Sequence, residues 1–162
     1  MQGLLSRWVL SRVIRSAFAF ETEAIELYRH LRERSGGARS CEGTLHDTFC
    51  RLLEEEERHW KILTGAAEGT LSHDEMEKLL DEHSTEELST LSPLSGEDLE
   101  RWGGELARAL EQEEKTWIFY GNLRRMSKIP AVKKAFEVLA KMEKGHVAVL
   151  RRLLGRDSSN GR

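Results

Sequence analysis

Glutamate and histidine recur at one spacing in both halves of the sequence. Glu56 is followed by His59, and Glu143 is followed by His146, so each pair has the pattern Glu-x-x-His. Residues three apart lie on the same side of a helix, so each pair can offer a carboxylate and an imidazole to one metal ion. The pattern alone is weak evidence, because glutamate is abundant in this sequence.

A second regularity makes the pattern specific. Glu21 precedes Tyr28 by seven residues, and Glu113 precedes Tyr120 by seven, so each half carries the same series of residues. If each half is a helical hairpin, all four glutamates stand about 20 Å from their own turn, at one level of the core. Burying an unpaired carboxylate is costly, and two divalent cations would balance four of them. We therefore expect a two-metal centre.

Four segments with helical periodicity must position these side chains. We expect long helices over residues 4–34, 44–64, 97–126 and 131–154, each carrying one of the four glutamates on its apolar face. Residues 65–96 form a crossover that contains a short helix, capped by the pattern Ser72-x-x-Glu75. Two antiparallel hairpins joined by one long crossover predict an all-α fold, the ferritin-like form of the four-helix bundle.

The composition fits one globular domain over residues 1–162, with residues 155–162 as a flexible tail. The sequence is 39% hydrophobic and 33% charged and has only two prolines, which excludes a largely disordered chain and favours helices. The net charge of −3 gives no reason to expect nucleic acid as a partner. We expect no membrane partner and a cytoplasmic location, because arginines interrupt every long apolar run near the N-terminus.

The two cysteines, Cys41 and Cys50, do not form a C-x-x-C pair, which excludes a zinc ribbon or a rubredoxin-type iron site. On a common helix the two residues would lie about 13 Å apart, too far for a disulfide. We therefore expect two free thiols in a reducing cytoplasm.

Several other residues are predicted to have ordinary roles. Within the run of four glutamates at 54–57 only Glu56 is expected to point inward, while Trp60 and Trp117 are expected to pack in the core. The basic residues of the last helix, Lys134 among them, are predicted to form a solvated face rather than a nucleic-acid site. The other four histidines are expected at the surface: His30, His46, His73 and His83.

The motifs "FETEAIELYRHL" and "LLEEEERHWKIL", repeated as "LEQEEKTWIFYGNL" and "LAKMEKGHVAVL", resemble the rubrerythrin branch of the ferritin-like di-iron carboxylate proteins. The resemblance covers residues 10–154. It implies two iron ions, with manganese or zinc as substitutes, in which Glu56 and Glu143 bridge the ions and Glu21 and Glu113 bind terminally. The implied ligands are Glu21, Glu56, His59, Glu113, Glu143 and His146.

The resemblance also suggests a role for Tyr28 and Tyr120, whose hydroxyls would hydrogen-bond ligand carboxylates across the bundle. The alternative is that both are ordinary core tyrosines. Two departures from the family stand out. The sequence ends in "GRDSSNGR", without the family's rubredoxin domain, and Thr116 occupies the position of a further glutamate. Glu114 is not expected to replace that glutamate, because it points about 100° away from Glu113.

The resemblance implies a redox enzyme, a non-haem di-iron peroxidase or oxidase. It would reduce hydrogen peroxide or dioxygen with electrons from ferrous iron and protect against oxidative stress. A rubredoxin-like protein would be the external electron donor, and a homodimer or higher homo-oligomer is expected. Two alternatives remain open: a ferroxidase that stores iron, and a metal-free helical bundle in which the glutamates pair with basic groups.

Overall fold

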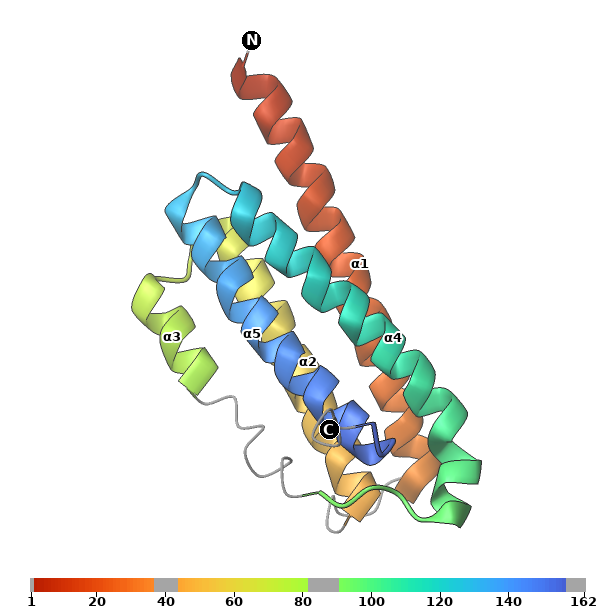
Figure 1. The fold of residues 1–162 in the computed structure, drawn as a ribbon. Coiled ribbons are helices and arrows are strands. Elements are labelled where there is room, and N and C mark those ends of the chain that lie inside the picture. The colour runs from red at the N-terminus through yellow and green to blue at the C-terminus, as the bar shows by residue number, and fades with distance from the viewer. Residues whose placement is uncertain (1, 37–43, 82–90, 157–162) are drawn as a thin grey trace, which may run out of the picture.

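The structure is a computed structural model in which residues 2–36, 44–81 and 91–156 are described. Within these residues the chain forms α-helices and no strands, which confirms the predicted all-α class (Figure 1). The predicted bounds of the long helices are right to within two residues, except that the second continues four residues further. The helices are α1 (Gln2–Gly36), α2 (Thr44–Glu68), α3 (His73–Asp81), α4 (Gly96–Met126) and α5 (Pro130–Leu153).

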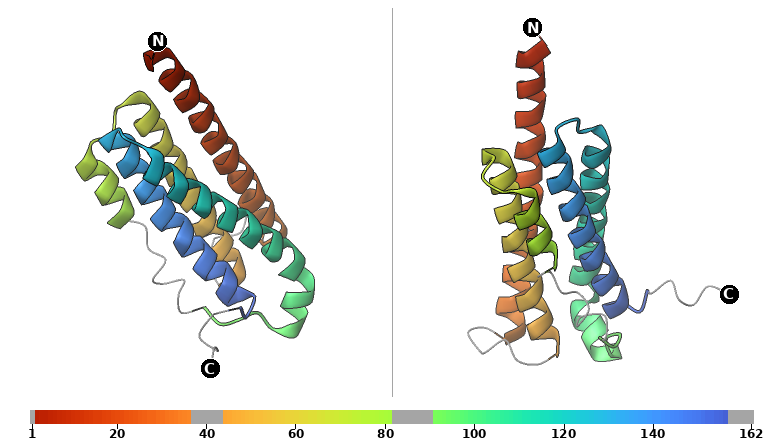
Figure 2. Two further views of the ribbon diagram at one scale, coloured as in Figure 1. Left: turned by 45° about the horizontal axis from the view of Figure 1, so that its top comes forward. Right: turned by 90° about the vertical axis from the view of Figure 1, so that its left-hand side faces the viewer.

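The four long helices pack as two hairpins. Helix α1 packs along α2, and α4 packs along α5. Contacts of α2 with α5 and of α1 with α4 join the hairpins, and α3 covers part of α5 (Figures 1 and 2). The N-terminal part of α1 extends beyond the ends of the other helices (Figure 2). Each long helix therefore has two long neighbours, and side chains from all four can meet along the bundle axis.

Two apolar clusters fill the core, one on each side of the predicted metal level. One cluster takes Tyr28 from α1, Phe49 from α2 and Leu150 from α5. The other takes Ile62 from α2 and Phe136 from α5. On every long helix the glutamate of the repeated pattern falls between the segments that supply the two clusters. Burying a large apolar side chain contributes about 1.5–3 kcal/mol, so the clusters fix the level at which the glutamates meet.

Helix α3 begins with the capping pattern that the sequence predicts. The backbone N–H of Ser72 donates to Glu75 Oε2 at 2.7 Å, and the backbone N–H of Glu75 donates to Ser72 Oγ at 3.2 Å. Met76 is buried, and Lys134 of α5 forms an ion pair with Glu77 of α3. The prediction that Lys134 lies on a solvated face is therefore wrong, because α3 covers it.

The roles predicted for two residues near the centre of α2 need correction. Glu55 is 6% exposed and forms an ion pair with Arg58 at 3.4 Å, so it is not a solvated carboxylate. Trp60 is 38% exposed, because it lies about 100° around the helix from His59. Its ring contacts Phe18 edge-on, with ring centroids 4.6 Å apart. Trp117 is partly buried and packs against both apolar clusters, as expected.

The histidines outside the repeated pattern differ in their surroundings. His30 and His73 are exposed, as predicted. His46 is instead partly buried, and its Nδ1 lies 2.8 Å from the hydroxyl oxygen of Ser35 at the end of α1. His83 lies outside the described residues. The prediction of a surface position is therefore wrong for His46, which packs between α1 and α2.

Cys50 is disulfide-bonded, so the prediction of a free thiol at this position is wrong. That prediction assumed a helix shared with Cys41, whereas α2 begins at Thr44. The spacing argument against a bond therefore does not apply. Cys41 itself lies outside the described residues.

The ends of the predicted crossover and tail are partly described. Residues 65–68 belong to α2 rather than to the crossover, and residues 82–90 and 157–162 lie outside the described residues. Helix α5 ends at Leu153, and Gly155 follows with a φ of 65°. Among the described helices, none combines the length and the apolar character that crossing a membrane requires.

Gly65 lies where α2 meets the segment before α3, and we expect Gly65→Ala to destabilise the protein by about 1–3 kcal/mol. An added Cβ would clash with Cγ and Cδ1 of Leu71, so Leu71 would have to move. Gly104 on α4 is a matched control, because in the described structure an added Cβ there meets no atom within 4 Å. Gly104→Ala should stabilise by about 0.5–1 kcal/mol. Equal effects in urea denaturation would contradict this prediction.

Candidate metal centre

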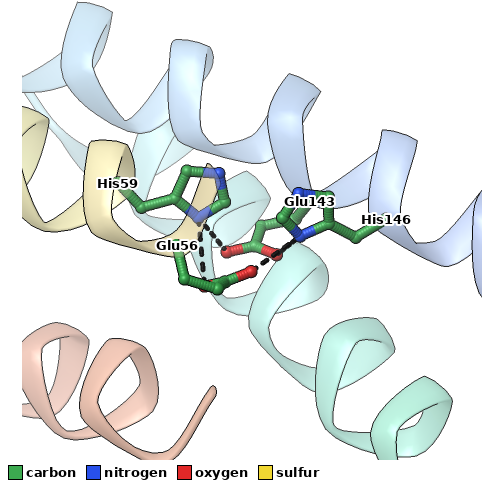
Figure 3. Close-up of side chains that lie close together, drawn as sticks. All are labelled: Glu56, His59, Glu143 and His146. Carbon is green, nitrogen blue, oxygen red and sulfur yellow. Dashed lines mark ion pairs between the residues drawn. The ribbon is translucent and has the colours of Figure 1, made fainter. Parts of the chain in front are cut away.

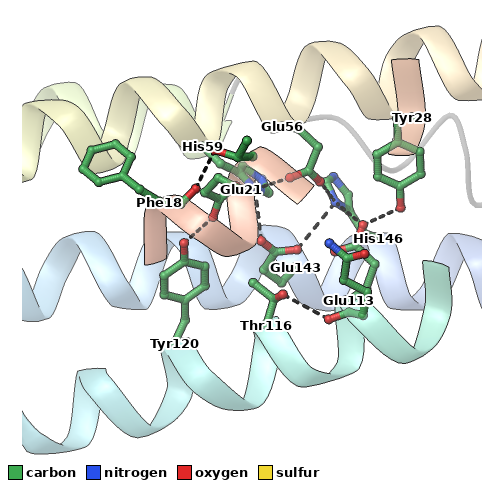
Figure 4. Close-up of polar contacts among 12 residues, drawn as sticks. Phe18, Glu21, Tyr28, Glu56, His59, Glu113, Thr116, Tyr120, Glu143 and His146 are labelled. Carbon is green, nitrogen blue, oxygen red and sulfur yellow. Dashed lines mark hydrogen bonds and ion pairs between the residues drawn. The ribbon is translucent and has the colours of Figure 1, made fainter. Parts of the chain in front are cut away.

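The structure brings the six predicted ligand residues together in the middle of the bundle. They come from α1, α2, α4 and α5, and none is more than 2% exposed (Figure 4). Water therefore does not solvate their charges. The six residues are Glu21, Glu56, His59, Glu113, Glu143 and His146.

Four of these residues form a compact group that can hold a metal ion. Glu56, His59, Glu143 and His146 each offer one ligand atom, and these atoms all lie within 4.8 Å of one another (Figure 3). His59 Nδ1 lies 3.1 Å from Glu143 Oε1 and 3.4 Å from Glu56 Oε2. His146 Nδ1 lies 2.7 Å from Glu56 Oε1 and 3.7 Å from Glu143 Oε2. No second group of this kind occurs in residues 2–36, 44–81 and 91–156.

Glu21 and Glu113 approach this group from α1 and α4. Glu21 Oε2 lies 3.3 Å from His59 Nδ1, and Glu113 Oε1 lies 3.7 Å from His146 Nδ1. The arrangement is nearly symmetric, because Glu21 lies beside His59 and Glu113 lies beside His146. Each half of the chain therefore contributes one Glu-x-x-His pair and one further carboxylate.

The two tyrosines exchange hydrogen bonds between α1 and α4 (Figure 4). The hydroxyl of Tyr120 donates to Glu21 Oε1, and the hydroxyl of Tyr28 donates to Glu113 Oε1. Both tyrosines are fully buried. Each hydroxyl therefore binds a carboxylate of the other hairpin, which excludes a purely apolar packing role for either tyrosine.

The spacing of the ligand atoms fits a shared cation. Two ligand atoms bound at right angles, each about 2.1 Å from one ion, lie about 3.0 Å apart. The distances of 2.7–3.7 Å from the histidine Nδ1 atoms to the carboxylate oxygens bracket this value. Within the described structure, both side-chain oxygens of Glu56 and of Glu143, and Oε2 of Glu21, are buried and accept no hydrogen bond. Buried oxygens without donors cost free energy, which a bound cation would remove.

Burial and the neighbouring charges shift the pKa values of the carboxylates in opposite directions. Burial raises the pKa of Glu21 to about 7, although His59 partly offsets the effect. Burial and the adjacent Glu113 raise the pKa of Glu143 well above its usual value. Burial would also raise the pKa of Glu56, but His59 and His146 outweigh it and lower this pKa. Of Glu21, Glu56 and Glu143, only Glu56 therefore favours its charged form more than an ordinary glutamate does.

The histidines and tyrosines of the centre retain their protons at neutral pH. Burial lowers the pKa of a histidine, but the surrounding carboxylates outweigh burial here. Glu56 in particular raises the pKa of His146 to about 10, and it raises the pKa of His59 well above the usual value. Burial and the adjacent carboxylates raise the pKa of Tyr28 and Tyr120, so both hydroxyls remain donors. Without metal, protons therefore balance part of the carboxylate charge.

Two residues near the centre do not join it. The hydroxyl of the buried Thr116 donates to the backbone oxygen of Gln112 at 3.0 Å. The carboxylate of Glu114 forms an ion pair with Arg151 at 2.6 Å, which agrees with the expectation that it points away from Glu113. Neither Thr116 nor Glu114 therefore adds a carboxylate to the centre.

The fold and the site define an all-helical protein with a buried glutamate–histidine cluster that can hold a metal ion. No protein-family model matches the chain, and no curated protein or solved structure matches it either.

Proposed function

We propose that this chain is a rubrerythrin-like member of the ferritin-like di-iron carboxylate proteins and binds two iron ions in the buried centre. The observation that carries the proposal is the meeting of four carboxylates and two imidazoles inside an apolar core. Two divalent ions carry four positive charges, which would balance the four carboxylates. Oxygen ligands together with imidazole suit iron or manganese better than copper, and zinc is a further substitute.

We further propose that the protein reduces hydrogen peroxide, or dioxygen, and so protects against oxidative stress. Two bound ferrous ions would supply one electron each, which together with two protons converts one peroxide molecule into two water molecules. Glu56 and Glu143 stand between the two histidines and would be shared by both ions. Tyr28 and Tyr120 orient the carboxylates of α4 and α1, and the apolar clusters on either side exclude bulk water.

The surroundings of this reaction are also proposals. An external rubredoxin-like protein would return the electrons. We propose a homodimer or higher homo-oligomer in the cytoplasm. No nucleic acid or membrane is part of the proposed function.

The ferrous-loaded protein is expected to consume about one peroxide molecule per chain rapidly and then stop, because two ferrous ions provide the two electrons that one O–O bond requires. Stopped-flow absorbance after mixing with excess peroxide measures the amplitude. The double variant Glu56→Ala, Glu143→Ala should lose the fast phase. Glu114→Gln, which alters an outward carboxylate, should retain it. A rubredoxin-like donor should restore turnover.

Iron storage predicts a different result in the same instrument. If peroxide consumption is negligible and dioxygen oxidises many ferrous ions per chain into a mineral, the protein is a ferroxidase and the peroxidase proposal is wrong. The mass in solution gives a second criterion, because a dimer encloses no mineral.

One observation favours a metal-free structural core as a second candidate. The raised pKa values of His59 and His146 allow two protonated imidazoles to neutralise two carboxylates. In that state the cluster would be an internal ion-pair network without a redox role. Elemental analysis after anaerobic reconstitution with ferrous iron separates the candidates. Two ions per chain support the proposed centre, and none supports the structural core.

A further inference from the structure

We propose that the two metal ions bind in a fixed order: the first to the residues of α2 and α5, and the second only when the carboxylates of α1 and α4 join. This inference rests on the proposed two-metal function and concerns how the centre fills. Its basis is a difference between the two groups of ligands in the position and hydrogen bonding of their carboxylates.

The group from α2 and α5 is already assembled. Its four side chains are fully buried, and one ligand atom of each lies within 4.8 Å of the others (Figure 3). Both members of each Glu-x-x-His pair project from one helix, and the two helices are in direct contact. In the described structure, the four carboxylate oxygens of Glu56 and Glu143 accept no hydrogen bond. A cation entering this group gains two imidazoles and two carboxylates that are already close together and that no tyrosine hydroxyl binds.

Glu21 and Glu113 stand outside this compact group, and each already accepts a hydrogen bond. Tyr120 donates to Glu21 Oε1, so only Oε2 faces His59 without a donor. In Glu113 the oxygen that faces His146 is Oε1, the same atom that accepts the hydroxyl of Tyr28. These carboxylates are partly satisfied without metal and gain less from the first cation.

Charge also favours this order. One divalent ion with Glu56 and Glu143 is electrically balanced, so a second ion close by gains little attraction from these two carboxylates and is repelled by the first ion. The second ion therefore needs the two remaining negative charges, which Glu21 and Glu113 supply. Neutralising these two residues should remove the second binding step and leave the first.

Cobalt(II) is a suitable probe, because its visible absorption reports the coordination number, and calorimetry reports affinity and stoichiometry. We expect the unaltered protein to bind two ions in separate steps, the second weaker by about 10-fold or more. The double variant Glu21→Gln, Glu113→Gln should bind one ion, with an affinity within about 3-fold of the first step. In the double variant Glu56→Gln, Glu143→Gln the affinity of the first step should fall by about 100-fold or more. Glu114→Gln should resemble the unaltered protein.

The order is refuted if the Glu21→Gln, Glu113→Gln variant binds two ions or none while its far-ultraviolet circular dichroism stays helical. Should that variant fail to fold, the isotherm of the unaltered protein decides. Two resolved steps support the order, and a single step with two equivalent ions refutes it. Stepwise binding without peroxide reduction would refute the oxidoreductase alone. Peroxide reduction by a protein that takes both ions in one step would refute only the order.

Discussion

Loading the protein with two equivalents of a divalent ion at pH 8 is expected to raise the melting temperature by about 10 °C. A ligand at about 1,000 times its dissociation constant stabilises the native state by about 4 kcal/mol, and a chain of this size gains about 2–4 °C per kcal/mol. The physical cause is the replacement of repulsion among buried carboxylates by attraction to the ions. Calorimetric scans of the protein with and without metal measure the gap.

The gap should widen as the pH rises, because the metal-free protein loses stability in that direction. The folded-state pKa of Glu21, about 7, lies above its unfolded value of 4.5, as does that of Glu143. Stability from such groups is present at low pH and is lost as the pH rises through the folded value. His59 and His146 act in the same direction, up to about pH 10 for His146. The lowered pKa of Glu56 acts only below about pH 4.5.

Scans at pH 5.5, 7 and 8.5 test this dependence. Glu111→Gln is a suitable control, because this carboxylate is exposed and pairs with Lys115 on the surface of α4. The variant should leave the gap between metal-free and metal-loaded protein unchanged at each pH. Equal melting temperatures with and without metal over the whole pH range would show that the native cluster does not bind a cation.

Metal binding is expected to release at least two protons per chain near pH 6.5, so the apparent affinity should rise by about 100-fold per pH unit. A metal ligand must be deprotonated, whereas the metal-free cluster holds protons on both histidines and on Glu143, and partly on Glu21. These groups interact and titrate together, so the total release is the quantity to compare with experiment.

Calorimetric titrations in two buffers with different ionisation enthalpies give the number of protons directly. Glu137→Gln is a matched control, because this partly exposed carboxylate on α5 pairs with Lys141 rather than with the cluster. It should release as many protons as the unaltered protein. An affinity that does not vary between pH 6 and 7.5 would mean that the cluster binds metal already deprotonated, and the proposed charge balance would be wrong.

The helices and the level of the centre could be predicted from the sequence because both depend on local spacing. Apolar periodicity gave the helix bounds, and the pattern from Ser72 to Glu75 gave the start of α3. The seven-residue step from Glu21 to Tyr28, repeated in the second half, indicated carboxylates at one height. Identical spacing in two hairpins places side chains together whatever the exact angle between the hairpins.

The errors arose where the environment of a residue depends on a distant segment. Lys134 is covered by α3, whose docking position has no local signal. Glu55 looks solvated in a run of glutamates, yet it is buried on a partly shielded face of α2. The disulfide of Cys50 was not predicted, because the spacing argument assumed that Cys50 shares a helix with Cys41, whereas α2 begins at Thr44. The hydrogen bonds from Tyr28 and Tyr120 to carboxylates were only one of two alternatives. The sequence of one helix does not show which side chains of another helix lie opposite it.

The exchange of hydrogen bonds between α1 and α4 has a consequence for how the native state assembles. The hydroxyl of Tyr28 and its acceptor Glu113 are 85 residues apart in the chain, and Tyr120 and Glu21 are 99 apart. Each hairpin can form from neighbouring segments, but neither contains the tyrosine hydroxyl that its own Glu21 or Glu113 accepts. Closing such long loops is slow and follows local folding. We therefore expect the centre to be completed only when the two hairpins dock, so that a metal ion would stabilise an assembled bundle rather than start its assembly.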